Sequence, residues 1–489
     1  MSDREVQRGV TRQLGPDWTV APLFRDFGAL RGGRALRDFF VAKYDKASPS
    51  SLLVHPFDIA YALRDRLNLE SVVPDLTWNL GKALLDGLCM GATLPAPADR
   101  AWSLRAMNVP EAWDANTTGQ GVLIGHIDTG WAPHVDLDES RLDLTRSYNV
   151  LRDGAHDGDA RDRMLDEFGK PFEFPGHGTG TASVIVSEGR VSPLGPGGEG
   201  NTTQPGFVTG VAPGATLVPI RASRSVIIWH PSDIARAILH AVEQGCHVIS
   251  MSLGGPPSPA MEAALNLAVE NDVIVIVAAG NCIEQVTFPA RYPAAIAVGG
   301  SNQDSKPWRG SCQGRSVAIS APAENVYHAK PIDDAGNLST SLVVPYQGTS
   351  FATAAVAGVA ALWLAKFGRD ELRKLYPQNR LQSVFRERLR STAHVPAGWD
   401  TENLGAGIVD AARVVREPLS PMDGPDKPLS LSSPLDLLLS GVPFEHGERV
   451  METLQPLLSM SAGDVESGAR RSAEPPLETG GERSCCTPR

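Results

Sequence analysis

The chain has 489 residues, and 45 Lys and Arg against 56 Asp and Glu give it a net charge of -11 at pH 7. This length fits two to three domains. The acidic balance argues against a nucleic-acid-binding protein, which usually presents a basic face. The longest apolar run, residues 352–365, is too short to span a bilayer and predicts a buried core helix, so we expect no membrane partner either.

Residues 1–8 are polar and charged, without the apolar core of a secretory signal. We therefore expect a cytoplasmic location, where cysteines stay reduced, although export by another route stays open. Cys246 enters an apolar strand and is expected in the core. For Cys282 three alternatives stay open: pairing with Cys312, control of activity by oxidation, or a free thiol without a role.

Residues 1–95 have their own pattern and are predicted to form an N-terminal domain. Apolar side chains recur at helical spacing over residues 57–63, and residues 72–76 (VVPDL) have the composition of a strand end. Residues 93–99 (TLPAPAD) contain two prolines and are typical of a linker. A domain boundary, or a self-cleavage site, is expected in this linker.

Residues 101–415 are predicted to form an α/β domain. Apolar strands alternate with apolar-periodic helices, which indicates a parallel sheet covered on both faces. Two long loops interrupt this alternation, one over residues 150–174 and one over the glycine-rich residues 193–204.

The strand predicted over residues 122–127 (VLIGHI) ends in Asp128, which Thr129-Gly130 follows. Open α/β sheets place ligands and chemistry at the carboxyl ends of their strands. His126 lies on the same face of the strand as Asp128, because side chains alternate. It is predicted to be a partly buried neighbour, or else to perturb the acid.

Of the eleven histidines, only His177 lies in a segment suited to a catalytic group, residues 175–183 (PGHGTGTAS). The glycines allow a close approach of the backbone, and a helix of small residues follows. An imidazole in this position can take the proton of a nucleophilic hydroxyl if a carboxylate such as Asp128 orients it.

The strand predicted over residues 273–277 (VIVIV) leads into Asn281. The side-chain NH₂ of an asparagine at a strand end can stabilise a developing oxyanion. Removing such a donor costs about 10²–10³ in kcat, a figure measured on a subtilisin.

Residues 347–353 (QGTSFAT) place Ser350 at the start of a long apolar helix, predicted from Phe351 to about residue 367. The positive end of a helix and its unpaired N–H groups favour nucleophilic attack and oxyanion binding. The alternative is that Ser350 is only an N-cap. The presence of His177 and Asp128 upstream favours the nucleophile.

The chain order Asp128, His177, Asn281, Ser350 resembles that of the subtilisin-like serine proteases, the subtilase or S8 family. The Asp, His, Ser order distinguishes this family from chymotrypsin-like enzymes and α/β-hydrolases. Further segments between these positions also resemble the family: 210–215 (GVAPGA), 249–255 (ISMSLGG), 288–293 (FPARYP) and 404–411 (LGAGIVDA). The resemblance covers about residues 101–415 and implies a three-layer α/β fold with a mostly parallel central sheet.

The resemblance also implies the roles in catalysis. Ser350 would attack the scissile carbonyl, His177 would move the proton and Asp128 would orient the imidazole. Asn281 and the Ser350 N–H would hold the oxyanion.

Substrate-binding residues follow from the same resemblance. Ser252, Leu253, Gly254 and Gly255 would form a strand that pairs with an extended peptide through backbone hydrogen bonds. Thr287 would form the floor of the main specificity pocket, which favours small or medium uncharged side chains.

Competing catalytic motifs are incomplete in this sequence. An aspartic protease needs two carboxylates, and no second Asp-Thr-Gly or Asp-Ser-Gly is present. Residues 348–352 lack the last glycine of the hydrolase nucleophile elbow. The zinc motif His-Glu-x-x-His and the phosphate-binding P-loop are also absent.

Asp153, Asp157 and Asp159 are side chains of the kind that bind calcium. A solvated acidic loop is the commoner explanation, so no resident cofactor is expected. Residues 416–489 are rich in Pro, Ser, Gly and Glu and are predicted to be mostly disordered. Two apolar islands in this tail, residues 435–439 and 454–458, are candidates for docking on a partner or on the enzyme itself.

Three functions from different classes stay open. The first is a serine endopeptidase, a monomer acting on peptides or proteins and made as a self-inhibited precursor. In this case residues 1–95 would resemble the small βαβ-type propeptides of subtilases, although a permanent docking or regulatory domain is an equal alternative. The second is a peptide macrocyclase of the same fold, and the third is a binding scaffold that does not catalyse.

Overall fold

The computed structural model describes the chain over residues 3–14, 17–24, 30–33, 36, 39–44, 56–67, 72, 91–113, 117–151, 158–165, 172, 174–189, 207–228, 230–283, 285–333, 335–377 and 379–419. The glycine-rich loop predicted at 193–204 and the two apolar islands of the tail lie outside these residues. The N-terminal part and the α/β region belong to one compact unit, Met1–Ser433.

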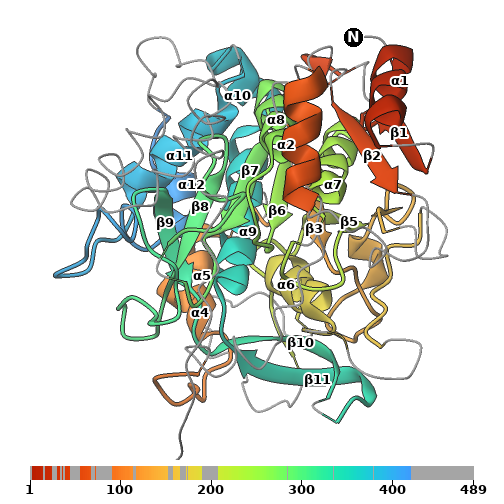
Figure 1. Cartoon of the computed structure of the whole chain (residues 1–489). Coiled ribbons are helices and arrows are strands. Elements are labelled where there is room, and N and C mark those ends of the chain that lie inside the picture. The colour runs from red at the N-terminus through yellow and green to blue at the C-terminus, as the bar shows by residue number, and fades with distance from the viewer. Residues whose placement is uncertain are drawn as a thin grey trace, which may run out of the picture. The chain divides into compact units, whose positions relative to one another are not determined.

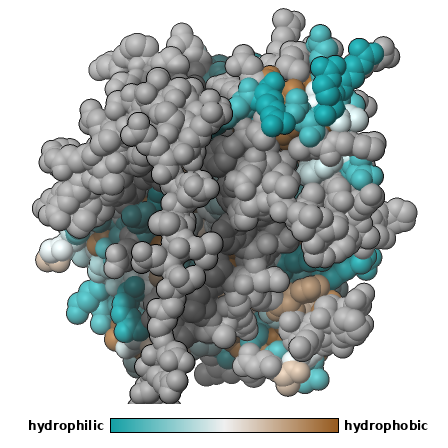
Figure 2. Space-filling view, viewed as in Figure 1, coloured by the Kyte–Doolittle hydropathy of each residue, from teal (hydrophilic) through white to brown (hydrophobic). Residues whose placement is uncertain are grey.

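The N-terminal part combines two helices with a small sheet. Its elements are α1 (Asp3–Leu14), β1 (Trp18–Pro22), β2 (Phe40–Tyr44) and α2 (Pro56–Leu67). Val6, Val10 and Leu63 are buried together against apolar side chains of the sheet. Hydrophilic residues cover its outer surface in Figure 2, with apolar residues showing between them.

This arrangement confirms a small α+β part but differs from the expected βαβ order. Strands β1 and β2 pair antiparallel, and the described residues between them form no α-helix. A parallel pair needs a crossover, usually helical, whereas an antiparallel pair does not. Of the strand end predicted at 72–76, only Val72 is described, and it lies outside any strand.

A seven-stranded sheet forms the centre of the α/β region, in the order β4-β5-β3-β6-β7-β8-β9. Its strands are β3 (Leu123–Asp128), β4 (Tyr148–Asn149), β5 (Thr216–Arg221), β6 (Val248–Met251), β7 (Ile274–Ala278), β8 (Ile296–Ser301) and β9 (Val317–Pro322). Every neighbouring pair is parallel, which confirms the predicted sheet. The strand order reverses between β3 and β6, and a ligand crevice is expected at such a switch point.

Helices cover both faces of this sheet (Figure 1). Helices α6 (His177–Val186) and α9 (Thr349–Phe367) contact each other on one face, and α7 (Pro231–Glu243) and α8 (Pro259–Glu270) contact each other on the opposite face. The alternation of β3 shows the two faces: His126 bonds to Thr181 of α6, whereas Gly125 packs against Ala241 of α7. The predicted three-layer fold is confirmed.

Smaller elements complete the region. They are α4 (Trp102–Ala106), α5 (Val109–Ala112), the 3₁₀ turn η4 (Glu139–Arg141), the antiparallel hairpin β10 (Val326–Ile332) with β11 (Leu338–Tyr346), α10 (Arg369–Leu375), α11 (Leu381–Thr392) and α12 (Ala411–Arg416). The hairpin β10–β11 packs against α6, the helix that begins at His177.

Helix α9 is the central helix of the core. It is long and apolar enough to cross a bilayer by length and composition, but 83% of its most apolar window is buried inside the protein. Its side chains from Thr349 to Leu364 are all buried. This helix is therefore the buried core helix that the apolar run 352–365 predicted.

Candidate active site

Three neighbouring strands bring the predicted site residues to one edge of the sheet. Asp128 is the last residue of β3, Ser252 follows β6, and Asn281 lies three residues after β7. These strands are adjacent in the order β3-β6-β7. Because parallel strands end at the same edge, the three side chains lie at the carboxyl edge where chemistry is expected.

His177 and Asp128 are in direct contact. His177 Nδ1 lies 2.7 Å from Asp128 Oδ1. His177 is the first residue of α6, after Gly176 in the left-handed conformation (φ 76°). Gly178 packs so closely on Gly130 that an added Cβ would lie 2.0 Å from the Gly130 carbonyl oxygen. The glycines around His177 thus bring its helix against the turn that follows Asp128.

The carboxylate of Asp128 is buried and held by several donors. Thr129 N donates to Oδ1 at 2.7 Å, and Thr181 Oγ1 donates to Oδ2 at 3.2 Å. Burial alone would raise the pKa of Asp128, but the charge and hydrogen bond of His177 outweigh it and keep the pKa below its usual value. The acid therefore stays ionised, as required to orient an imidazole and stabilise its charged form.

His126 lies beside this acid without contacting it directly. Its Nε2 is 2.9 Å from Thr181 Oγ1 and 4.0 Å from Asp128 Oδ2. Burial lowers the pKa of His126, against the opposite influence of Asp128. His126 is therefore a neutral neighbour that shares Thr181 with the acid.

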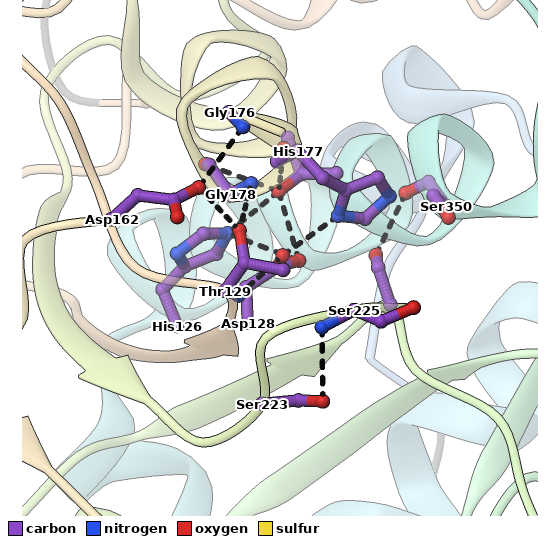
Figure 3. Close-up of polar contacts among 12 residues, drawn as sticks. His126, Asp128, Thr129, Asp162, Gly176, His177, Gly178, Ser223, Ser225 and Ser350 are labelled. Carbon is purple, nitrogen blue, oxygen red and sulfur yellow. Dashed lines mark hydrogen bonds and ion pairs between the residues drawn. The ribbon is translucent and has the colours of Figure 1, made fainter. Parts of the chain in front are cut away.

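Ser350 lies in the first turn of α9, at the second helical position. Gly348 is the N-cap, so the N-cap alternative for Ser350 is wrong, and the helix begins at Thr349, earlier than predicted. The hydroxyl of Ser350 faces the imidazole of His177, which lies between Ser350 and Asp128 (Figure 3). The N–H groups of a first turn have no partners within the helix, so they are available to an oxyanion.

Thr349 orients the amide of Asn281. Thr349 N and Thr349 Oγ1 donate to Asn281 Oδ1 at 3.0 and 2.9 Å. A backbone N–H can only donate, so the amide oxygen must face Thr349. The NH₂ group is then left for another acceptor, and it lies near Gly348, two residues before Ser350. Thr349 has this role because the helix starts one residue before Ser350.

Thr287 lies close to two glycines of the site. A Cβ added to Gly254 would lie 2.7 Å from Thr287 Oγ1, and one added to Gly280 would lie 2.8 Å from the same atom. Cys312 Sγ lies on the Gly280 side. Burial raises the pKa of the Cys312 thiol to about 12, so it stays neutral. The threonine side chain therefore narrows the space beside both glycines.

The edge predicted to pair with substrate already has a partner. Gly254 N donates to Val226 O at 3.0 Å, and Ile228 N donates to Gly254 O at 2.8 Å. Residues 226–228 therefore occupy the backbone groups of Gly254, because backbone donors and acceptors must be satisfied when no peptide is bound. A Cβ added to Gly255 would lie 2.6 Å from Ile228 Cβ.

The remaining residues of the predicted substrate strand face inward. Ser252 Oγ donates to the carbonyl oxygen of Ser350 at 3.0 Å, and Leu253 is buried. Ser225, next to residues 226–228, points toward Ser350 (Figure 3). The pairing of Gly254 with an extended substrate thus stays a prediction, and it requires residues 226–228 to move aside.

Asp162 is a site residue that the sequence did not reveal. Its Oδ2 accepts from Thr129 Oγ1 at 2.8 Å and from Gly176 N at 3.0 Å, and Thr129 and Gly176 each adjoin one member of the Asp128–His177 pair (Figure 3). Burial raises the pKa of Asp162 to about 6. The only signal available was an acidic residue in the loop before His177, a loop with many such residues.

Cys282, next to Asn281, is disulfide-bonded. Of the three alternatives for Cys282, pairing with Cys312 is wrong, because Cys312 is a free buried thiol, and a free thiol at Cys282 is wrong as well. Cys246 is also free and buried, as expected for a core residue.

Of the three aspartates that could bind calcium, only Asp159 lies among the described residues. Asp159 bonds to the Arg161 guanidinium, with Nε at 3.0 Å, whereas Asp153 and Asp157 lie outside the described residues. Among the residues whose structure is described, no group of three or more His, Cys, Asp or Glu side chains is arranged to hold a metal ion. Calcium binding stays a prediction.

Comparisons with known proteins show the family of this chain. Residues 119–410 match the model of the Subtilase family, Peptidase_S8. The chain is 32% identical to subtilisin Savinase of Lederbergia lenta over 263 residues, which are 53% of this chain and 82% of that protein. It is 29% identical to mycosin-1 of Mycobacterium tuberculosis over 434 residues, 77% of this chain and 85% of that protein. A protease structure from Pseudoalteromonas arctica matches with 26% identity and a TM-score of 0.52, covering 66% of this chain and 99% of that one.

The expected cytoplasmic location is wrong. The relatives that this chain matches, such as M-protease and mycosin-1, are evidence against it. The disulfide at Cys282 agrees with this, because disulfides persist in oxidising compartments. The polar character of residues 1–8 was a poor guide, since it says nothing about other routes of export.

Proposed function

Because this chain belongs to the subtilase family and is a serine endopeptidase, we propose that Ser350, His177 and Asp128 carry its reaction through an acyl-enzyme, as in class EC 3.4.21. The observation that carries this assignment is the 2.7 Å contact between His177 Nδ1 and the buried Asp128 carboxylate. That contact leaves Nε2 of the imidazole free to take the proton of Ser350.

In the first step Ser350 Oγ attacks the scissile carbonyl while His177 accepts its proton. The carbonyl oxygen becomes negative, and the Asn281 NH₂ and Ser350 N–H stabilise it. His177 then gives the proton to the leaving amine. In the second half of the reaction His177 takes a proton from water, which attacks the acyl-enzyme, and then returns that proton to Ser350 Oγ. Asp128 remains ionised throughout and stabilises the imidazolium.

The substrate is a peptide or protein with a small side chain before the cleaved bond. Support comes from Thr287, whose side chain narrows the space beside both Gly254 and Gly280. Backbone pairing with Gly254 becomes available once residues 226–228 move aside. We expect the enzyme to act as a monomer, without nucleic acid or membrane as a partner, and to be made as a precursor that residues 1–95 inhibit.

A set of peptide anilides tests this function. They differ only in the residue before the cleaved bond, which is Ala, Phe or Arg. We expect cleavage by the wild type to be fastest after Ala, and Ser350→Ala to abolish cleavage of all three. Cleavage that survives in Ser350→Ala would refute the assigned nucleophile, and preference for Arg would refute the role of Thr287.

A further inference from the structure

A buried glutamate holds the segment that joins the N-terminal part to the α/β region. Glu324, in the turn between β9 and β10, is 1% exposed. Its Oε1 accepts from Thr93 Oγ1 at 2.7 Å, from Leu94 N at 3.0 Å and, at a shorter distance, from Thr93 N. Its Oε2 is buried without a hydrogen-bond partner. Burying a carboxylate oxygen without a hydrogen-bond donor costs free energy of folding. One further donor beside Oε2 would therefore stabilise this turn.

The contacts of this segment begin abruptly at Thr93. Leu94 O accepts from Asn325 Nδ2 at 2.8 Å, and Pro97 O accepts from Tyr327 Oη at 2.9 Å. Gly91, Ala92 and Thr93 are all exposed. In contrast to Thr93, however, no hydrogen bond to Gly91 or Ala92 is found within the described part of the chain. Thr93 is therefore the first residue of this segment that hydrogen-bonds to the α/β region, and the Ala92 side of the bond before it is exposed.

We infer that the precursor is cut between Ala92 and Thr93 and that Glu324 then binds the new α-ammonium group of Thr93. In the cut, water adds its oxygen to the Ala92 carbonyl carbon, the C–N bond breaks, and the Thr93 nitrogen leaves as an amine that takes up a proton. No oxidant or cofactor is needed. This inference rests on the proposed endopeptidase activity and names one of its substrates, the chain itself.

The chemistry of the pair favours the cut form. An α-ammonium offers three donors where the amide offered one, so it can serve both Oε1 and Oε2 of Glu324. A hydrogen bond between two charged groups is stronger than one from a neutral amide. The carboxylate is already buried in the uncut chain, so it loses no further hydration when the ammonium forms.

The residue before the cut also fits the specificity pocket. Ala92 carries only a methyl group, which suits the space that Thr287 narrows. Either Gly91 or Ala92 can enter the cleft of a second enzyme molecule without breaking a described hydrogen bond. The proposed cut lies immediately before residues 93–99, which the sequence predicts as a linker.

The new terminus is linked to the nucleophile through the backbone. Ala323, next to Glu324, accepts a hydrogen bond from Gly348 N at 2.8 Å. Gly348 lies two residues before Ser350 and is the N-cap of α9. Pairing of Thr93 with Glu324 therefore holds the turn that supports the Ser350 loop.

Intact mass and N-terminal sequencing of the purified full-length chain test the position of the cut. The expected product begins at Thr93, and Ser350→Ala stays uncut. A fluorophosphonate probe is added to the same wild-type sample. A labelled enzyme that is uncut, or that begins elsewhere, overturns this inference but leaves the protease intact. An enzyme that the probe does not label overturns the protease assignment itself.

Reaction of the Thr93 α-amine with an acylating reagent at pH 7 tests the pairing. Only the neutral amine reacts, and each unit by which Glu324 raises the pKa of the amine lowers the neutral fraction about tenfold. We expect cut Glu324→Gln to react at least about tenfold faster than cut wild type. The control is Glu402→Gln, which changes an exposed carboxylate bonded to Arg315 and should react like wild type.

Thermal unfolding separates this pairing from a general structural role of Glu324. In the uncut Ser350→Ala background, Glu324→Gln should change the midpoint little, because an amide oxygen still accepts from Thr93 and Leu94. In the cut enzyme it should lower the midpoint clearly. Equal amine reactivity in cut wild type and cut Glu324→Gln contradicts the pairing. Should Glu324→Gln not fold, slower reaction of Thr93 in native than in denatured wild type is the decisive readout.

Discussion

Asp128 and His177 already share a 2.7 Å contact, whereas Gly254, which is predicted to pair with substrate, is already bonded to residues 226–228. The first region is set for reaction before any substrate arrives. The second must exchange two internal hydrogen bonds for two to the peptide, and such an exchange yields little net free energy. Chemistry and binding in this enzyme should therefore respond differently to mutation.

The largest effect is expected in the acid–base region. His177→Ala should lower kcat about 10⁶-fold, because neither the serine proton nor the leaving amine then has a partner. Steady-state hydrolysis of the alanine anilide measures this loss. Retention of more than a hundredth of wild-type turnover would show that another group acts as the base.

Asn281→Ala should lower kcat about 10²–10³-fold with little change in KM, because its NH₂ binds the oxyanion and not the ground-state carbonyl. Thr349→Val is the companion variant, since it removes the hydroxyl that donates to Asn281 Oδ1 and should cause a smaller loss. A change that falls mainly on KM would mean that Asn281 binds substrate instead.

Asp162→Ala should lower kcat by up to about 10²-fold, because displacement of catalytic groups by 1 Å can have that cost. The Oδ2 that anchors both Thr129 and Gly176 would be gone. Asp159→Ala, which removes an aspartate that bonds to Arg161, is the control and should keep wild-type turnover. Equal activity of the two variants would refute a positioning role for Asp162.

At the edge formed by Gly254 and Gly255, a mutation is expected to improve substrate binding, whereas the mutations above lower kcat. Ile228 is buried against Gly255, so Ile228→Ala should loosen residues 226–228 and lower KM for long peptides severalfold. Reaction with a small fluorophosphonate, which needs no pairing with Gly254, should keep its wild-type rate. Ile283→Ala changes an exposed side chain and serves as the control. An unchanged or higher KM in Ile228→Ala would show that residues 226–228 do not compete with substrate.

The smallest effect concerns stability and pH. Burial raises the pKa of Asp162 to about 6 in the folded state, from its ordinary value of 3.8. The folded state thus binds this proton more tightly than the unfolded state does. The contribution of Asp162 to the free energy of unfolding therefore falls as pH rises from about 4 to 6 and stays constant above pH 6. Wild type should lose thermal stability relative to Asp162→Asn over this interval. A difference that is independent of pH would contradict the raised pKa.

Sequence reasoning predicted the layers of the fold and the residues of the site because both depend on local patterns. Apolar runs end at Asp128 and before Asn281, and parallel strands bring such ends to one edge. The glycines around His177 indicated close backbone contact, which the structure shows as Gly178 packed on Gly130.

The remaining features depend on partners far apart in the chain. Asp162 contacts Thr129 and Gly176 only after the loop before α6 has folded back. Glu324 meets Thr93 across more than two hundred residues. No local pattern marks such pairs, and the same holds for the bonds between residues 226–228 and Gly254.

The rate at which a fluorophosphonate forms an adduct on Ser350 measures directly whether His177 and Asp128 activate this serine, because the small probe does not depend on the occupied substrate edge. We expect stoichiometric labelling of Ser350 in wild type and a rate about 10⁴-fold lower in Asp128→Asn, whose amide would favour the wrong imidazole tautomer. Wild-type Ser350 that stays unlabelled, or an Asp128→Asn variant that labels as fast as wild type, would contradict it.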